Sequence, residues 1–303
     1  MSLPARDTAA GRAYLDLQNR ARREQRGTQE LLTMYVVERW LARLAASGFA
    51  GDFILKGGML LAAFGNRRPT QDADVLARNM SADQDTVAVR VAGIAALASP
   101  DGEDGVEFLP ATIRTRIIRD DALYVGVRVT MDAKIATADV RLRLDINFGD
   151  PVTPAPQTIE LPALRPDARP VRLLGYPVET VLAEKIATAI NLGAVSTRVR
   201  DWSDIYTLTG AHPIQHATAR EALVATTEFR GTELVPLSQA IGVLVQLRTQ
   251  TYLAYRRSLG VEGEHLPGKF SEVVDAVVTF ADLLSEECPE TTWDPVKRRW
   301  RPT

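Results

Sequence analysis

Residues 139–148 alternate polar and apolar side chains along their whole length. Successive side chains of a β-strand point to opposite faces of the sheet, so this segment would have one apolar and one polar face. The pattern predicts a half-buried strand, and with residues 106–138 it predicts an antiparallel meander over 106–148. The apolar set is Val140, Leu142, Leu144, Ile146 and Phe148, and the polar set is Arg141, Arg143, Asp145 and Asn147.

Helical and extended segments alternate through the first two-thirds of the chain. Helical spacing is present over 8–47, where Thr28 is a candidate N-cap. Six prolines between 150 and 170 exclude a helix there and predict an extended connector or edge segment. Further helices are predicted over 59–64, 83–98, 178–193, 199–209, 213–229, 233–259 and 270–287, and further strands over 53–55 and 70–76.

This order of segments predicts an α+β fold, with a mixed sheet flanked by helices. The 303 residues allow one large domain or two modest ones. We expect a mixed domain over 1–210 and a helical C-terminal lobe over 211–303.

Composition excludes several classes of protein. One cysteine, Cys288, cannot form an intrachain disulfide or a cysteine-rich zinc site, and three histidines leave little for a histidine metal cluster. No apolar run approaches the roughly 18 residues of a membrane-spanning helix, and no signal-peptide core is visible, so we expect a cytoplasmic protein. The net charge of −2 excludes a uniformly basic nucleic-acid binder.

Paired carboxylates are the first candidate for chemistry. Asp72 and Asp74 are two residues apart in a predicted strand and would project from the same face. Like charges at this spacing repel each other unless a cation neutralises them, and Mg²⁺ prefers such carboxylate oxygens. A surface turn would also accommodate Asp-x-Asp. Asp145, on the polar face of its strand, could complete a metal site or face solvent.

A glycine turn precedes this pair. Lys56, Gly57 and Gly58 follow the strand predicted over 53–55 and precede a helix. Tandem glycines let backbone N–H groups approach a phosphate closely, although an ordinary turn has the same residues. No Gly-Lys-Ser/Thr follows, so this is not a Walker A loop.

A helical lysine is the last candidate. Lys185 falls within the apolar stripe of the helix predicted over 178–193. Such a lysine can extend its ammonium to solvent, or it can face a cleft and contact nucleotide phosphates. Asp201 and Asp204 are neighbours on the next helix, and Asp204 could reach back toward Lys185.

The ordered set of motifs resembles the AbiEii/AbiGii nucleotidyltransferase toxin family, which includes the MenT type. It consists of Lys-Gly-Gly, Asp-x-Asp, a strand acid, Glu-Thr-Val-Leu-Ala-Glu-Lys and Arg-Asp-x-x-Asp-Ile-Tyr, and it spans residues 53–208. The resemblance implies a DNA polymerase β-like nucleotidyltransferase core. It also implies a Mg²⁺-dependent enzyme that uses an NTP and is paired with an antitoxin.

The resemblance also assigns roles to residues. It implies that Gly57 and Gly58, together with Lys56, bind the triphosphate, and that Asp72 and Asp74 bind metal and act in catalysis. Met59 stands where the family has Ser or Thr, which removes a hydroxyl contact to phosphate. Further implied roles are a phosphate contact for Lys185, a catalytic acid for Asp204 and a third metal ligand for Asp145.

Three functions remain open at this point. The first is transfer of a nucleoside monophosphate to RNA, in particular to the 3′ end of tRNA, by a toxin. The second is the same transfer to a protein or small molecule, and the third is a non-catalytic binding protein of the same fold. Arginine clusters near Arg20–Arg26, Arg67–Arg68, Arg198–Arg200 and Lys297–Arg301 favour RNA if they converge on one face.

Overall fold

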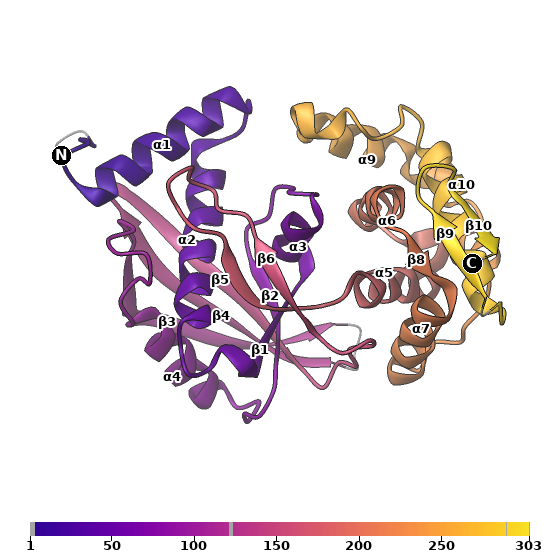
Figure 1. Cartoon of the computed structure of the whole chain (residues 1–303), viewed down its shortest axis with the longest axis horizontal. Coiled ribbons are helices and arrows are strands. Elements are labelled where there is room, and N and C mark those ends of the chain that lie inside the picture. The colour runs from indigo at the N-terminus through magenta and orange to yellow at the C-terminus, as the bar shows by residue number, and fades with distance from the viewer. Residues whose placement is uncertain (1–3, 121–123, 289, 303) are drawn as a thin grey trace. The chain divides into compact units, whose positions relative to one another are not determined.

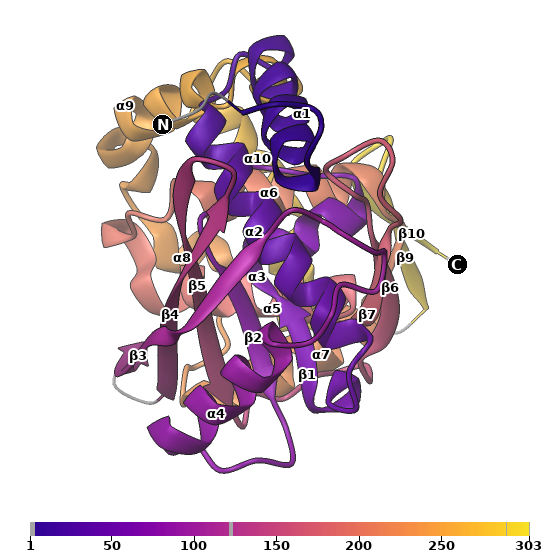
Figure 2. The same cartoon turned by 90° about the vertical axis from the view of Figure 1, so that its left-hand side faces the viewer.

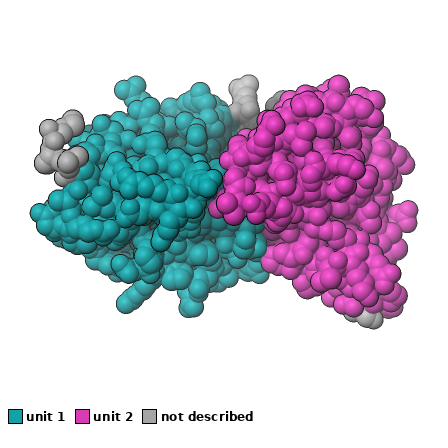
Figure 3. Space-filling view, turned by 90° about the horizontal axis from the view of Figure 1, so that it is seen from above, with its two compact units in different colours: residues 1–149, 157–175 teal, residues 150–156, 176–303 magenta. Residues whose placement is uncertain are grey.

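The computed structural model describes residues 4–120, 124–288 and 290–302, and the chain folds as two compact units (Figure 3). Unit 1 contains residues 1–149 and 157–175, and unit 2 contains residues 150–156 and 176–303. The boundary predicted at residue 210 lies inside a helix of unit 2, α6 (Val199–Ala211). Among the described residues, no helix has both the length and the apolar character needed to cross a membrane.

Unit 1 is built on a seven-stranded mixed sheet with the order β3-β4-β5-β2-β1-β7-β6 (Figures 1 and 2). The β2–β5 and β1–β7 pairs are parallel and the others are antiparallel, which confirms the predicted mixed sheet. The strands are β1 (Phe53–Lys56), β2 (Ala73–Ala77), β3 (Glu107–Asp120), β4 (Tyr124–Ile135), β5 (Ala138–Phe148), β6 (Gln157–Leu161) and β7 (Val171–Gly175).

The predicted meander is β3–β4–β5, and the proline-rich segment contributes the edge strand β6. Residues 121–123 of the meander lie outside the described part of the chain. On β5 the alternation holds, because Leu142, Leu144 and Ile146 are fully buried while Arg141 is exposed. The strand therefore has the apolar and polar faces that its sequence indicates.

Helices cover the apolar face of this sheet. Helix α2 (Thr28–Ala45) packs on β5 and β7, and α4 (Gln84–Ala95) packs on β3 and β4. Helix α1 (Ala9–Arg23) packs on α2 and β4. The N-cap predicted at Thr28 is wrong by one residue, since Gly27 caps α2 and Thr28 begins it.

Unit 2 is mainly helical, and it also contains a three-stranded sheet with the order β10-β9-β8. The helix predicted over 233–259 is divided at Gly242, where a positive φ of 42° ends α8 before α9 begins. The elements are α5 (Val178–Leu192), α6, β8 (Ile214–Gln215), α7 (His216–Arg230), α8 (Leu237–Ile241), α9 (Leu244–Ser258), α10 (Phe270–Ala281), β9 (Thr291–Asp294) and β10 (Arg299–Pro302).

Aromatic packing fixes the small sheet to the helices of unit 2. Trp293 on β9 is fully buried and lies 5.0 Å from Phe280 between ring centroids, in an edge-to-face arrangement. Trp300 on β10 stacks on Phe280 with a centroid distance of 5.2 Å. The indole N–H of Trp293 donates to the Thr209 carbonyl at 2.7 Å, so the C-terminal strands are joined to both α10 and α6.

Candidate active site

Four charged residues lie in one row across the sheet of unit 1. Asp74 on β2 is directly opposite Asp145 on β5 and directly opposite Lys56 on β1. Arg128 on β4 is directly opposite Asp145 and extends the row by one strand. Residues paired in this way share a face of the sheet and are separated by about 4.8 Å per strand. The row, Lys56–Asp74–Asp145–Arg128, places two carboxylates between two cations.

Arg128 and Asp145 form a bidentate ion pair. The Arg128 Nε atom lies 2.6 Å from Oδ1 of Asp145, and Nη2 lies 2.5 Å from Oδ2. This hydrogen bonding raises the pKa of the Arg128 guanidinium, and the charges of Asp145, Asp72 and Asp74 raise it further. Asp145 therefore lies beside Asp74, but both of its oxygens contact Arg128, and its role as a third metal ligand stays a prediction.

The carboxylate of Asp74 lies directly against the glycine turn. Gly57 has a φ of +64°, and a Cβ atom at this position would lie 1.9 Å from Oδ2 of Asp74. Only glycine meets both conditions, since an L side chain strains this backbone and would displace the carboxylate. The glycine turn and the Asp-x-Asp motif, which the sequence treats separately, are therefore one structure.

A threonine and an arginine line the same turn and were missed as site residues in the sequence. A Cβ atom on Gly58 would lie 2.8 Å from Oγ1 of Thr70 and 3.3 Å from Nη1 of Arg68. The Thr70 hydroxyl also lies 3.3 Å from both the carbonyl and a carboxylate oxygen of Asp72. The available signal was the position of Thr70, two residues before Asp72 in an extended segment.

A hydroxyl group lies near the second glycine even though Met59 supplies none. The Met59 side chain is buried in the core from α3 (Gly57–Leu60), which continues into a 3-10 turn at Leu61–Phe64. The hydroxyl missing at position 59 has a counterpart in Thr70, which reaches the second glycine from a different segment. Lys56, the last residue of β1, is largely buried beside these groups.

The donor set fits a cation that arrives with a nucleotide. Within residues 4–120, 124–288 and 290–302, no group of three or more His, Cys, Asp or Glu is arranged to hold a metal. Mg²⁺ in phosphoryl-transfer sites is usually held by one or two carboxylates, with substrate phosphates and water as the other ligands. Asp72 and Asp74 match that smaller set.

Lys185 is part of a separate cluster in unit 2. Its Nζ atom lies 2.6 Å from Oδ1 of Asp201 and 2.8 Å from Oδ2 of Asp204. The predicted approach of Asp204 to Lys185 is confirmed, and Asp201 joins it. Asp204 is 1% exposed and the Lys185 side chain 12%, so the ammonium neutralises a buried carboxylate.

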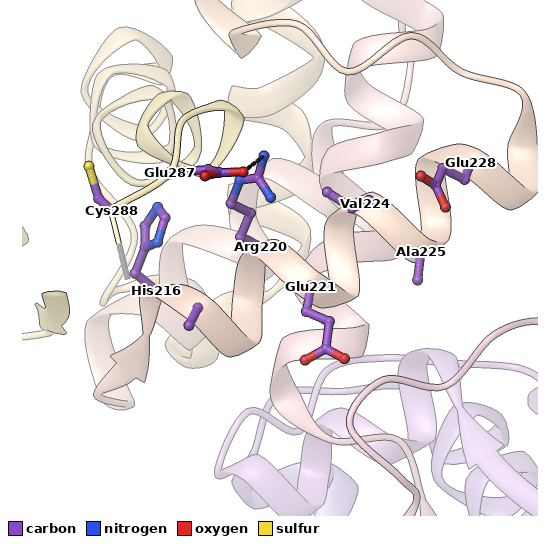
Figure 4. A pocket seen from close by; sticks show the side chains of 9 residues that line it. His216, Arg220, Glu221, Val224, Ala225, Glu228, Glu287 and Cys288 are labelled. Carbon is purple, nitrogen blue, oxygen red and sulfur yellow. Dashed lines mark ion pairs between the residues drawn. The ribbon is translucent and has the colours of Figure 1, made fainter. Parts of the chain in front are cut away.

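A cavity of about 460 Å³ in unit 2 contains none of the predicted site residues. Figure 4 shows His216 and Arg220 on α7 in its wall, beside Glu287 and Cys288. Three glutamates line the cavity against one arginine, so its charge disfavours a triphosphate. The predicted site residues lie instead at the carboxylate row and at the Lys185 cluster, outside this cavity.

Two solved structures share the fold of this chain. MenT4, a nucleotidyltransferase toxin of Mycobacterium tuberculosis, is 16% identical, and the match covers 90% of this chain and 98% of MenT4 with a TM-score of 0.50. A structure from Helicobacter pylori described as a nucleotidyltransferase is 15% identical, and the match covers 86% of this chain and 96% of that chain with a TM-score of 0.52. Both matches show the fold.

The sequence itself identifies the family. A search of curated proteins finds no match. The model of the nucleotidyl transferase AbiEii toxin family, of type IV toxin–antitoxin systems, matches residues 39–278. This range includes the glycine turn, all the carboxylates of the row and the Lys185 cluster. The chain therefore belongs to the AbiEii family of nucleotidyltransferase toxins.

Proposed function

We propose that the protein transfers a nucleoside monophosphate from an NTP to the 3′ end of an RNA, specifically tRNA, in the cytoplasm. The observation that carries the proposal is the Asp74 carboxylate, which lies against Gly57 and in a row where two carboxylates stand between two cations. The acceptor hydroxyl would attack the α-phosphate in line, and pyrophosphate would leave. As a toxin, the protein would be held in check by a cognate antitoxin.

The glycine turn would bind the triphosphate. The backbone N–H groups of Gly57 and Gly58 would donate to phosphate oxygens, and Lys56 and Arg68 bring positive charge to the same turn. The Thr70 hydroxyl offers a further polar contact beside Gly58. These groups would orient the nucleotide with its phosphates toward the carboxylates.

Asp72 and Asp74 would hold Mg²⁺ together with the phosphates of the NTP. The metal would neutralise charge on the phosphates and lower the pKa of the acceptor hydroxyl. Thr70, which contacts the Asp72 carboxylate, would position that ligand. Asp145 remains a prediction as a third ligand, because its use requires the pair with Arg128 to open.

Lys185 would contact a phosphate and offset the charge that develops on the leaving pyrophosphate. Asp204 would fix the position of the Lys185 ammonium, to which it lies 2.8 Å away. The same contacts also stabilise unit 2, so a role in transfer has to be separated experimentally from a role in folding.

Incubation with each labelled NTP, Mg²⁺ and total RNA, followed by gel electrophoresis, tests the acceptor. We expect label on RNA of tRNA size with the wild-type protein and none with the Asp72→Ala variant, whose folding is checked by thermal melting. Label on protein alone would replace RNA with a protein acceptor. Label on neither, with every NTP, would contradict the proposal.

A further inference from the structure

The polar face of the β3–β4–β5 meander carries arginines that no predicted cluster included. Arg114 and Arg116 are exposed on β3, and Arg141 and Arg143 follow the same alternation on β5. We call these four residues the arginine face. They lie on the side of the sheet opposite the buried face, to which Val129, Leu142 and Leu144 belong.

Strand register brings the arginine face to the carboxylate row. Arg116 is directly opposite Arg128, which is directly opposite Asp145. Two residues further along β4, Thr130 is directly opposite Arg114 on β3 and Arg143 on β5. Neighbouring strands lie about 4.8 Å apart and alternate residues on a strand about 6.6 Å apart, so the guanidinium groups form a grid beside the carboxylates.

These arginines retain unused hydrogen-bonding capacity. Neither Arg114 nor Arg116 forms an ion pair with another described side chain. Arg141 is paired with Asp132 at 3.0 Å, but both side chains are exposed, and such pairs are weak.

Three of the arginines that the sequence suggested for RNA binding form contacts within the fold. Arg20 pairs with Glu24, and Arg26 pairs with Glu30 and is almost fully buried. Arg298 packs on the Tyr206 ring at 3.7 Å from its centroid. These three side chains are engaged within the fold, whereas Arg114 and Arg116 are exposed and form no ion pair with another described side chain, which makes the arginine face a candidate for an anionic partner.

We infer that the arginine face binds the phosphodiester backbone of the RNA acceptor, an inference that rests on the proposed function. Guanidinium groups bind phosphate through two parallel hydrogen bonds, and the grid spacing is close to that of successive phosphates on an RNA strand. The arginine face adjoins the carboxylate row through Arg128, so a strand bound along it would bring its terminal nucleotide to Asp74. This arrangement selects the end of a strand as the acceptor.

Binding of a short fluorescein-labelled RNA, followed by anisotropy without NTP, tests the inference. The Arg114→Gln/Arg116→Gln variant should bind more weakly. Its slope of log affinity against log salt should be smaller by about 1.4, which is roughly 0.7 for each lost phosphate contact on a single strand. The matched control is Arg169→Gln/Arg257→Gln, which removes the same charge from exposed positions outside the arginine face and outside the clusters predicted from the sequence. Control binding should equal that of the wild type.

Equal affinity of the arginine-face variant and the wild type would overturn the inference, as would an equal loss in the control. Competition by polyglutamate as strong as that by unlabelled RNA would also overturn it, because the face would then bind any polyanion. Thermal melting of both variants checks that they are folded.

Activity separates this inference from the proposed function. If transfer to RNA occurs, the arginine-face variant should raise the KM for RNA and leave kcat and NTP binding unchanged. If the wild type transfers nothing from any NTP, the proposed function fails, while the anisotropy measurement still decides whether the face binds RNA.

Discussion

Gly57 links the two motifs of unit 1 at the level of a single residue. Its backbone has a φ of +64°, and its missing side chain leaves the space that the Asp74 carboxylate occupies. Gly65, eight residues later, also has a positive φ, of 79°, but a Cβ atom there would have no neighbour within 4 Å. The two glycines separate the effect of backbone strain from the effect of contact with Asp74.

The Gly57→Ala variant should lose transfer activity, whereas Gly65→Ala should keep it. Both should lose stability by roughly 1–2 kcal/mol, because each puts alanine into a left-handed conformation. Chemical denaturation measures the stability of each variant, and labelled-NTP transfer measures activity. Full activity in Gly57→Ala would show that the Asp74 carboxylate does not need its present position.

Two elements of unit 2, α5 and α6, are joined by the Lys185 ammonium. Lys185→Met should lower the free energy of unfolding by about 3–5 kcal/mol, because it leaves the buried Asp204 carboxylate with one fewer cation. Lys185→Met/Asp204→Asn should recover much of this loss. If Lys185 also contacts phosphate, the double variant will be stable and inactive. Activity restored along with stability would assign the cluster to folding alone.

The N-terminus of α4 supplies a pH-dependent contribution to the stability of unit 1. Asp83 accepts a hydrogen bond from the Thr86 backbone N–H at 2.8 Å, and hydrogen bonds from Thr86 lower the pKa of Asp83 from 3.8 to about 2. A lowered pKa in the folded state means that the contribution is complete above pH 3.8 and disappears as the pH falls to about 2. Asp83→Asn keeps an acceptor oxygen without titrating.

The melting temperature of the wild type should therefore fall relative to that of Asp83→Asn as the pH is lowered through this window. The comparison between the two proteins removes the contribution of the other carboxylates, which titrate in both. A difference that stays constant from pH 4 to about 2 would contradict a lowered pKa at Asp83.

At the scale of the whole molecule, local patterns predict the elements well and their pairings poorly. The alternation over 139–148 and the helical spacing over 178–193 correspond to β5 and α5. The strands β8, β9 and β10 were missed, because segments of two to four residues carry no periodic signal. The division of unit 2 at Gly242 was missed because a single positive φ decides it.

The same contrast between local patterns and long-range pairing applies to the candidate site. Asp72, Asp74, Gly57 and Lys185 are visible in the sequence because their motifs are local. Thr70 at Gly58 and the pair between Arg128 and Asp145 depend on strand register and on packing between distant segments. The arginine face likewise exists only once β3, β4 and β5 are aligned.

The net charge of the whole chain hides an uneven distribution of charge within unit 1. The chain has 36 basic and 38 acidic side chains, so its total charge is close to zero. Within unit 1, however, carboxylates lie at β2 and β5 and unpaired guanidinium groups lie on β3. A chain without overall positive charge can thus carry a local surface for an anionic polymer.

Labelled-NTP transfer by Asp74→Asn, compared with Asp132→Asn, tests the central claim most directly. Asp132 is a matched control, because it is a carboxylate on the same face of the sheet, four residues from Arg128 on β4. Asp74→Asn should lose transfer by about a hundredfold or more, since even changing a residue that supports a metal ligand costs roughly 10–100-fold. Asp132→Asn should transfer like the wild type. Equal transfer by the two variants would contradict the assignment of the active site to the carboxylate row.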